Sequence, residues 1–369
     1  MTGKRKILLV SSAFYPEISP RSLRATELAR EFSRQGHEVT VISKFRDHDY
    51  SDFLKEVPII FRMWRKQMFP YVPELKLKPF SFLSRGISRL LLLLFEYPGI
   101  EDMFKVKKML RHEREYDLMI SFAVPYPVHW GVAFSRSPGH RIAKIWVADC
   151  GDPYMGDVID SFKKPFYFGF LEKNFCRKAD FISVPISGAM DGYYKEFHDK
   201  IMVIPQGFDF DLGEVANDIW LNDVPTFAYA GGFIPGIRDP QQLMNYLTTL
   251  DIPFKFYVFT NNPGLFEEYR SILNEKLVIS GYIPRHELMR ILSRMDFLVN
   301  FDNNTSMNSP SKLIDYAITG RPVLNIKNKL YAEEILAFLK KDYSKRMILP
   351  NPAKYHIKNI SRNFLDLLN

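Results

Sequence analysis

A lysine in the first turn of a predicted helix carries the clearest chemical signal in this sequence. Residues 308–324 read NSPSKLIDYAITGRPVL, in which Ser309 suits an N-cap, a proline follows it and a glycine ends the helix. Lys312 therefore lies where the positive end of the helix dipole disfavours a cation by about 0.3–1 kcal/mol. A bound diphosphate would offset this cost, because the hydroxyls of Ser309 and Ser311 and the free helix N–H groups suit an anion. A lysine that points to solvent is the alternative.

Glycines and a second cation follow a strand-like run earlier in the same half. After PTFAYA the sequence reads GGFIPGIRDP, where Gly231 and Gly232 allow a tight turn and a close approach of the backbone to a phosphate. Arg238 follows near the start of the next predicted helix. We therefore expect Arg238 and Lys312 to stabilise one diphosphate together, although a simple tight turn also explains the glycine pair.

Two further features could recognise the rest of a nucleotide. Asp315, one turn beyond Lys312, could bind ribose hydroxyls or could pair locally with that lysine. The turn of Gly281, Tyr282 and Ile283 follows a predicted strand, and its backbone groups could bind the edge of a nucleobase.

In the first half of the chain, polar side chains follow two apolar runs. AVPYPVHWG brings His129 after the run at 117–122, and WVADCGDPYMGD brings Asp152 after the run at 141–149. Because ligands bind beyond the carboxyl ends of parallel strands, both residues are candidates for catalysis. A packed histidine and an aspartate that caps a local turn are the alternatives.

Two arginines open a predicted helix close to the amino terminus. The segment SPRSLRATE contains Arg21 and Arg24, which could bind a phosphate or a sugar on the acceptor side, or could face solvent. The sequence has no G-x-S-x-G nucleophile elbow, no Walker loop and no zinc-binding spacing of Cys and His. We therefore expect no resident metal ion.

The order of the predicted elements favours two parallel-sheet α/β domains. Apolar runs of strand length alternate with amphipathic helices in two successive halves, and the polar segment 209–225 between them is the best linker candidate. We predict an N-terminal domain at 1–208, a C-terminal domain at 209–352 and a terminal helix at about 353–369. Strands are predicted at 6–12, 37–43, 117–122, 141–149, 179–185, 200–205, 225–230, 255–260, 276–283, 296–302 and 322–326, and helices at 22–36, 83–94, 187–197, 240–250, 285–295 and 309–320.

Composition is that of a globular protein in a reducing compartment. The chain has 369 residues, of which 46% are hydrophobic and 25% charged, and this length exceeds one ordinary core. Its two cysteines, Cys150 and Cys176, provide no disulfide framework. The start, MTGKRKILLVSSAF, superficially resembles a signal peptide, but no cleavage site follows and a helix begins directly afterwards.

The net charge of +8 is unevenly distributed. Residues 61–90 hold seven basic residues and one acid, Glu74, with aromatic residues interleaved, and the apolar run LLLLLF follows directly. This pattern in 61–95 favours an anionic membrane surface, with a solvated rim over a core helix as the main alternative. We find no nucleic-acid recognition motif and expect no nucleic-acid partner.

Taken together, these segments resemble the family-4 glycosyltransferases of the GT-B fold over essentially the whole chain. The resemblance rests on KILLVSSAFYPEISPRSLRATELAREFSRQGHEVTVIS, ADFISVPISGAM with KIMVIPQGFD, FAYAGG, SGYIPRHELMRILSRMDFLVN and NSPSKLIDYAITGRPVLNI. It implies two Rossmann-like domains facing a cleft and a terminal helix that crosses back to the first domain.

The resemblance also implies an activity. The family transfers a sugar from a nucleotide donor, such as a UDP- or GDP-sugar, usually with retention and without a metal or other cofactor. Many bacterial members build surface polysaccharides on glycan or lipid-linked acceptors at the inner face of the cell membrane, which implies a cytoplasmic, peripheral membrane enzyme.

Residue roles follow from the same resemblance. Asp152, His129, Lys312 and Arg238 are expected to be catalytic, and Arg21 and Arg24 to lie on the acceptor side. The residues expected to bind the donor are Gly231, Gly232, Arg238, Gly281, Tyr282, Ile283, Ser309, Ser311, Lys312, Leu313 and Asp315.

The sequence departs from the family pattern at several of these positions. Met307 stands where a sugar-contacting Glu is usual, and the ribose acid is Asp315 rather than Glu. Ser19 and Pro20 replace the usual glycine pair, and the arginine usual after 226–230 is missing. A nucleotide-sugar epimerase or hydrolase of the same fold, or a GT-B binding subunit without activity, are therefore the alternatives.

Overall fold

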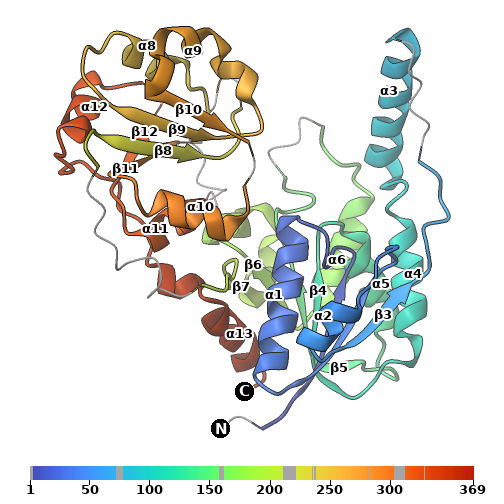
Figure 1. The fold of residues 1–369 in the computed structure, drawn as a ribbon. Coiled ribbons are helices and arrows are strands. Elements are labelled where there is room, and N and C mark those ends of the chain that lie inside the picture. Colours follow the sequence, from blue (N-terminus) through green and yellow to red (C-terminus); the bar gives the residue numbers. More distant parts are fainter. Residues whose placement is uncertain are drawn as a thin grey trace. The chain divides into compact units, whose positions relative to one another are not determined.

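The computed structural model describes residues 3–71, 78–157, 162–210, 222–234, 236, 238–281, 283–302, 312–327 and 329–369, with the backbone alone for 78–83. The chain forms two compact units (Figure 1). The first unit comprises Met1–Asp209 and Lys354–Asn369, and the second comprises Phe210–Ala353. Each boundary falls one residue from the predicted one, and most of the predicted linker lies outside the described residues.

The first unit is built on a seven-stranded parallel sheet with the order β3-β2-β1-β4-β5-β6-β7. Apart from the edge strand β3, its strands are largely buried along their length, as expected for a sheet covered on both faces. The strands are β1 (Lys6–Ser11), β2 (Glu38–Lys44), β3 (Ile60–Trp64), β4 (Tyr116–Phe122), β5 (Ala143–Asp149), β6 (Phe181–Val184) and β7 (Ile201–Val203).

Helices cover both faces of this sheet, and alternate strand residues point to each of them. One core cluster joins Leu9 and Leu118 to α1, α2 and α13, and the other joins Leu8 and Met119 to α4, α5 and α6. The helices are α1 (Pro20–Arg34), α2 (Ser51–Glu56), α3 (Lys78–Phe95), α4 (Glu101–Met109), α5 (Pro127–Ser135), α6 (Phe168–Lys178) and α13 (Ile357–Asp366).

The terminal helix α13 belongs to the first unit, as predicted from its resemblance to a crossover helix. Ile357, Ile360 and Phe364 are buried in the cluster beneath α1. The amide of Gln35 donates to the hydroxyl of Ser361 at 2.8 Å, which fixes the two helices side by side (Figure 1).

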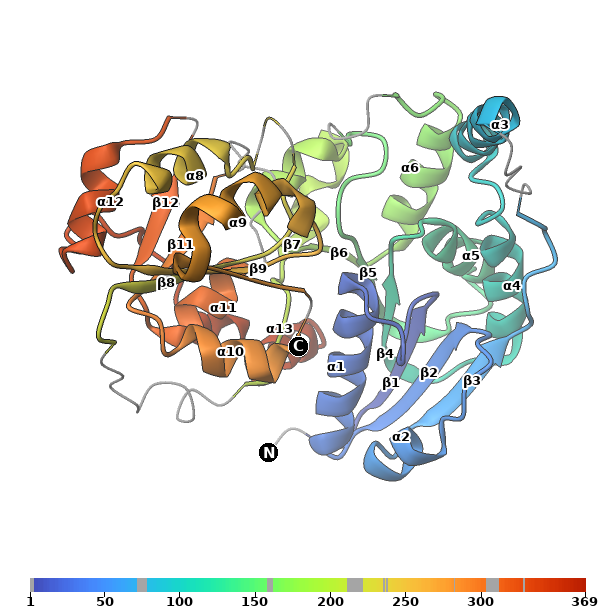
Figure 2. The same cartoon turned by 45° about the horizontal axis from the view of Figure 1, so that its top comes forward.

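The second unit contains a five-stranded parallel sheet with the order β10-β9-β8-β11-β12. Stacked rings of Phe227, Phe256 and Phe297 fill the core under α8, α9 and α12, while α10 and α11 cover the other face. Figure 2 shows these two helix layers from a second direction. The elements are β8 (Thr226–Ala230), β9 (Lys255–Phe259), β10 (Leu277–Ser280), β11 (Phe297–Phe301), β12 (Val323–Ile326), α8 (Gln241–Thr248), α9 (Glu267–Leu273), α10 (Arg285–Leu292), α11 (Lys312–Thr319) and α12 (Ala332–Leu339).

Most predicted elements are confirmed, one prediction was wrong, and several elements were not predicted: β3, α2, α4, α5, α6, α9 and α12. The helix expected at 187–197 consists of two short 3₁₀ segments, Ser187–Gly192 and Lys195–Lys200. The basic segment after residue 60 contains strand β3, which sequence reasoning missed because its residues alternate between exposed and half-buried positions. Across the described residues, no helix has the length and apolar character needed to cross a membrane.

Candidate functional site

Two cationic side chains, Lys312 and Arg238, lie close together at the carboxyl end of β8. The Nζ of Lys312 and the Nε of Arg238 are both buried, and neither has a hydrogen-bond partner among the described residues. The amine lies over the ring of Tyr229, 4.4 Å from its centroid. Burial, reinforced by the charge of Arg238, lowers the pKa of Lys312 to about 7. A bound anion would relieve both effects, so this arrangement suits a phosphate group.

The loop after β8 is shaped by glycine and by the same tyrosine. Gly231 has φ of 148°, which disfavours other residues, and an added Cβ would lie 3.1 Å from the Oη of Tyr229. The hydroxyl of Tyr229 donates to the carbonyl of Gly232 at 2.8 Å. Arg238 is held because its N–H donates to the carbonyl of Ile234 at 2.8 Å and its carbonyl accepts from the N–H of Ile234. Backbone pairing thus fixes Arg238 beside the glycine turn.

Helix α11 positions Lys312 over that turn. Tyr316, four residues later on the same helical face, is fully buried, and its hydroxyl accepts the N–H of Ala230 at 3.0 Å. The small side chains of Ala228 and Ala230 let α11 pack closely on β8. The helix ends at Thr319 and Gly320 follows with φ of 66°, as predicted.

Asp315 has a partner that the sequence did not reveal. Its Oδ1 accepts from Arg285 at 3.0 Å from Nε and 2.6 Å from Nη2. The alternative in which Asp315 pairs with Lys312 is therefore wrong, because that amine has no partner in the described part of the chain. The position of Arg285, directly after the predicted base-binding turn and Pro284, was the available signal.

The other predicted donor residues are distributed around this core. Gly281 is exposed at the end of β10, while Leu313 and Ile283 pack in the apolar cluster beneath α10 and α11. The remaining ones, Tyr282, Ser309 and Ser311, lie outside the described residues.

In the first unit, Asp149 at the end of β5 gathers most of the nearby polar groups. It is fully buried and accepts from Arg24 at 2.7 Å on both oxygens, from Ser183 at 2.6 Å and from Arg21 at 3.3 Å. Arg24 also donates to the carbonyls of Ile204 and Pro205. Arg24 cannot reach an acceptor from this buried position, so it supports the site, whereas Arg21 remains partly exposed.

His129 was predicted to be catalytic, but it lies in a buried polar network. Its Nδ1 is 2.8 Å from the hydroxyl of Ser121, and its Nε2 is 3.4 Å from the Sγ of Cys150. Burial lowers the pKa of His129 to about 3 and raises that of the Cys150 thiol to about 12, so both are neutral at pH 7. The imidazole contacts no solvent, and this geometry gives no support to the predicted role.

Asp152, unlike His129, is open to solvent, and its catalytic role stays a prediction. It is exposed just beyond β5, and its carbonyl accepts the hydroxyl of Tyr126 at 2.5 Å, which fixes the loop. Its carboxylate is thus available to a sugar hydroxyl.

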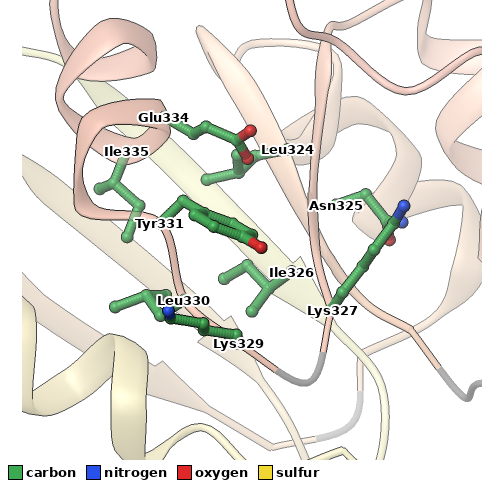
Figure 3. A pocket seen from close by; sticks show the side chains of 9 residues that line it. All are labelled: Leu324, Asn325, Ile326, Lys327, Lys329, Leu330, Tyr331, Glu334 and Ile335. Carbon is green, nitrogen blue, oxygen red and sulfur yellow. The ribbon is translucent and has the colours of Figure 1, made fainter.

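A small hollow lies at the carboxyl end of β12 in the second unit. Figure 3 shows the ring of Tyr331 across it, with Lys327, Lys329 and Glu334 around it. Its volume of about 100 Å³ is below the ~300 Å³ of an ordinary ligand site, so it does not hold a nucleotide sugar by itself.

Comparison with a protein-family model identifies the family of this chain. Residues 23–212 match the model of Glycosyltransferase Family 4, which is slightly more than half of the chain. The chain therefore belongs to Glycosyltransferase Family 4 and is a glycosyltransferase. The match lies mainly in the first unit and does not include the cations at β8.

Solved structures show the fold. A glycosyltransferase from Rickettsia africae has 13% identity and a TM-score of 0.60, and the match covers 99% of this chain and 98% of that one. Anabaena Alr3699/HepE in complex with UDP has 11% identity and a TM-score of 0.63, with 98% and 99% covered. The lipopolysaccharide outer core galactosyltransferase WaaB has 12% identity and a TM-score of 0.56, with 98% of each chain covered. A comparison with curated protein sequences finds no match. The two parallel-sheet units thus form a GT-B fold, as predicted.

Proposed function

We propose that this glycosyltransferase uses a nucleoside-diphosphate sugar, whose diphosphate binds between Lys312 and Arg238. The observation that carries the proposal is the buried amine of Lys312, which has no hydrogen-bond partner in the described chain and lies next to the guanidinium of Arg238. The leaving diphosphate gains negative charge in the transition state, and one preorganised donor at such a position typically contributes ~3–4 kcal/mol. Two fixed cations supply the positive charge that a metal ion would otherwise provide, which supports a metal-independent reaction.

The nucleotide and the acceptor follow from the similar structures. Alr3699/HepE is described in complex with UDP and with UDP-glucose, which favours a uridine donor over a guanosine one. WaaB acts on the lipopolysaccharide outer core, which supports a glycan or lipid-linked acceptor in polysaccharide biosynthesis. We propose that Asp152 orients the acceptor hydroxyl, that Arg21 contacts the acceptor, and that the anomeric configuration is retained, as is usual in the family.

The charge pattern of the first unit supports a location at the inner face of the cell membrane. The exposed basic and apolar residues of 61–71 and 84–95 would bring the enzyme to a lipid-linked acceptor. We propose a cytoplasmic protein that binds this membrane peripherally.

Calorimetry with UDP, GDP and CMP tests the donor site directly. We expect one nucleotide to bind the wild type, and Lys312→Ala to weaken its binding and to reduce turnover by roughly 10²–10³. Lys340→Ala, which removes an exposed lysine after α12, is the matched control and should bind normally. Normal binding and turnover of Lys312→Ala would exclude the proposed role.

Assays of the wild-type protein also distinguish a glycosyltransferase from the alternative functions. Conversion of the sugar nucleotide without an acceptor would indicate an epimerase or hydrolase, and nucleotide binding without any turnover would indicate an inactive subunit. Proton NMR of the product reports retention or inversion, and activity in the presence of a chelator reports metal dependence.

A further inference from the structure

Helix α3 is rich in leucine, and most of its described side chains are exposed or half-buried. Within the side chains described for it, 84–95, Ser84 alone is buried. Leu90 is 53% exposed and Phe95 57%. Figure 1 shows α3 standing out from the rest of the first unit. Several exposed apolar side chains on one helix indicate a surface that binds a partner.

A second segment, distant in sequence, adds aromatic side chains beside α3. Phe166, two residues before α6, is 80% exposed, and Phe170, in the first turn of α6, is 69% exposed. The hydroxyl of Tyr167 donates to the carbonyl of Leu94, and Arg89 lies 5.8 Å above the ring of Phe162. The start of α6 lies next to α3 in both views (Figures 1 and 2).

A third segment joins the same surface through Tyr97, just after α3. The hydroxyl of Tyr97 donates to the carbonyl of Pro70 at 2.6 Å, and its ring stacks on Phe69 at 5.7 Å. Met68 and Tyr71 beside them are strongly exposed. Residues 61–71, 84–95 and 162–170 therefore form one surface, which we call the aromatic face.

The charge of the aromatic face is predominantly positive. None of its three segments contains an Asp or Glu. Among the described residues, three acids that border the face are each buried and paired: Glu96 with Lys164, Glu101 with Lys105 and Glu113 with Arg62. The basic residues of the face that are exposed are Arg62, Arg65, Lys66, Arg85, Arg89 and Lys163.

We propose that the aromatic face docks on an anionic lipid bilayer, with Phe166 and Phe170 entering the interface beside α3. Basic side chains pair with anionic headgroups while leucine and phenylalanine enter the acyl boundary, which matches the composition of this face. A symmetric contact between two copies would place these cations against each other and is disfavoured. This inference extends the proposed membrane association by adding 162–170, and it does not depend on the donor.

Vesicle flotation of the full-length protein tests the proposal without any sugar nucleotide. Wild type should float with vesicles containing phosphatidylglycerol, should be released as salt rises, and should not float with pure phosphatidylcholine. Phe166→Ser with Phe170→Ser should lower the partition coefficient about tenfold or more, and Lys163→Glu about fivefold or more. Matched controls are Ile348→Ser, an exposed apolar residue of the second unit, and Arg114→Glu, an exposed arginine before β4.

The variants change exposed residues, so we expect them to fold, and circular dichroism is the check. Flotation equal to wild type in the double phenylalanine variant, or no flotation at all, would overturn the proposal. A wild-type dimer that becomes monomeric in the phenylalanine variants would also overturn it, by assigning the face to a second copy. Nucleotide binding measured on the same samples tests the proposed function separately.

Discussion

At the scale of single residues, the most informative feature is the buried amine of Lys312, which has no hydrogen-bond partner among the described residues. Lys312 is buried beside Arg238 without a carboxylate among the described residues, and its pKa falls to about 7. Keeping such a cation costs the free protein several kcal/mol, because each unit of pKa shift corresponds to about 1.4 kcal/mol. An apolar residue at this position would avoid the cost, and this is why we propose that Lys312 binds an anionic ligand.

This amine predicts that nucleotide affinity falls as pH rises from about 7 to 9. In the free protein Lys312 loses its proton near pH 7, whereas a bound diphosphate favours the charged form and raises its pKa. Below pH 7 the amine is charged in both states. Above it, binding must take up a proton, so the dissociation constant rises by up to about tenfold per pH unit.

Calorimetry in two buffers of different ionisation enthalpy measures that proton uptake. Lys312→Arg keeps its charge at all these pH values and should bind with little pH dependence. A wild-type dissociation constant that does not change over the range would contradict the prediction.

A second residue-scale prediction concerns a buried carboxyl in the first unit. Glu172 on α6 is fully buried, its Oε1 accepts the N–H of Met155 at 3.3 Å, and its Oε2 has no partner among the described residues. Burial raises its pKa from 4.5 to about 7. The folded state therefore keeps a proton that the unfolded state loses above pH 4.5, so stability falls between about pH 4.5 and 7, by roughly 3 kcal/mol.

Glu172→Gln removes this titration and retains an acceptor for Met155. We expect the variant to be more stable than wild type at pH 7 and nearly equal to it at about pH 5, measured by urea unfolding at both values. An equal difference at the two pH values would show that Glu172 does not titrate as described.

At the scale of elements, α13 acts as part of the first unit's core rather than as a loose tail. Phe364 is fully buried with Ile357 and Ile360, and its ring lies 5.5 Å from the guanidinium carbon of Arg24. Phe364→Ala should reduce the free energy of unfolding by about 3–5 kcal/mol, because it removes a buried ring and leaves a cavity. Urea unfolding measures this free energy. Phe134 is partly exposed, so Phe134→Ala is a control that should lower the free energy of unfolding much less.

Helices and strands were predicted correctly where the local sequence pattern agrees with the way the segment packs in the fold. Parallel strands such as β4 and β8 are continuous apolar runs because both faces of their sheets are covered, so composition alone locates them. The segment 187–197 has a helical composition, but glycines at 188 and 192 leave only short 3₁₀ segments.

In the candidate site too, local features could be predicted from the sequence, whereas long-range contacts could not. The glycine turn and the two cations could be predicted because helix and loop signals are local. The partner of a side chain depends on elements far apart in sequence. The Arg285–Asp315 pair spans 30 positions, and the burial of Arg24 depends on Asp149, 125 positions away. The sequence therefore predicted which residue types gather at the strand ends, but not which of them neutralise one another.

At the scale of the whole molecule, the division into two units predicts where a nucleotide acts. The two cations and the glycine turn belong entirely to Phe210–Ala353, whereas Asp149 and Asp152 belong to the first unit. UDP without a sugar should therefore slow hydrogen exchange in peptides covering 226–240 and 312–320 and leave the amides of α6 and α13 nearly unchanged. At a hundred times the dissociation constant, binding adds about 2.7 kcal/mol to the stability of the unit that holds the site. Lys312→Ala should lose this protection while exchange elsewhere stays as in wild type, and protection confined to the first unit would place the nucleotide at Asp149 instead.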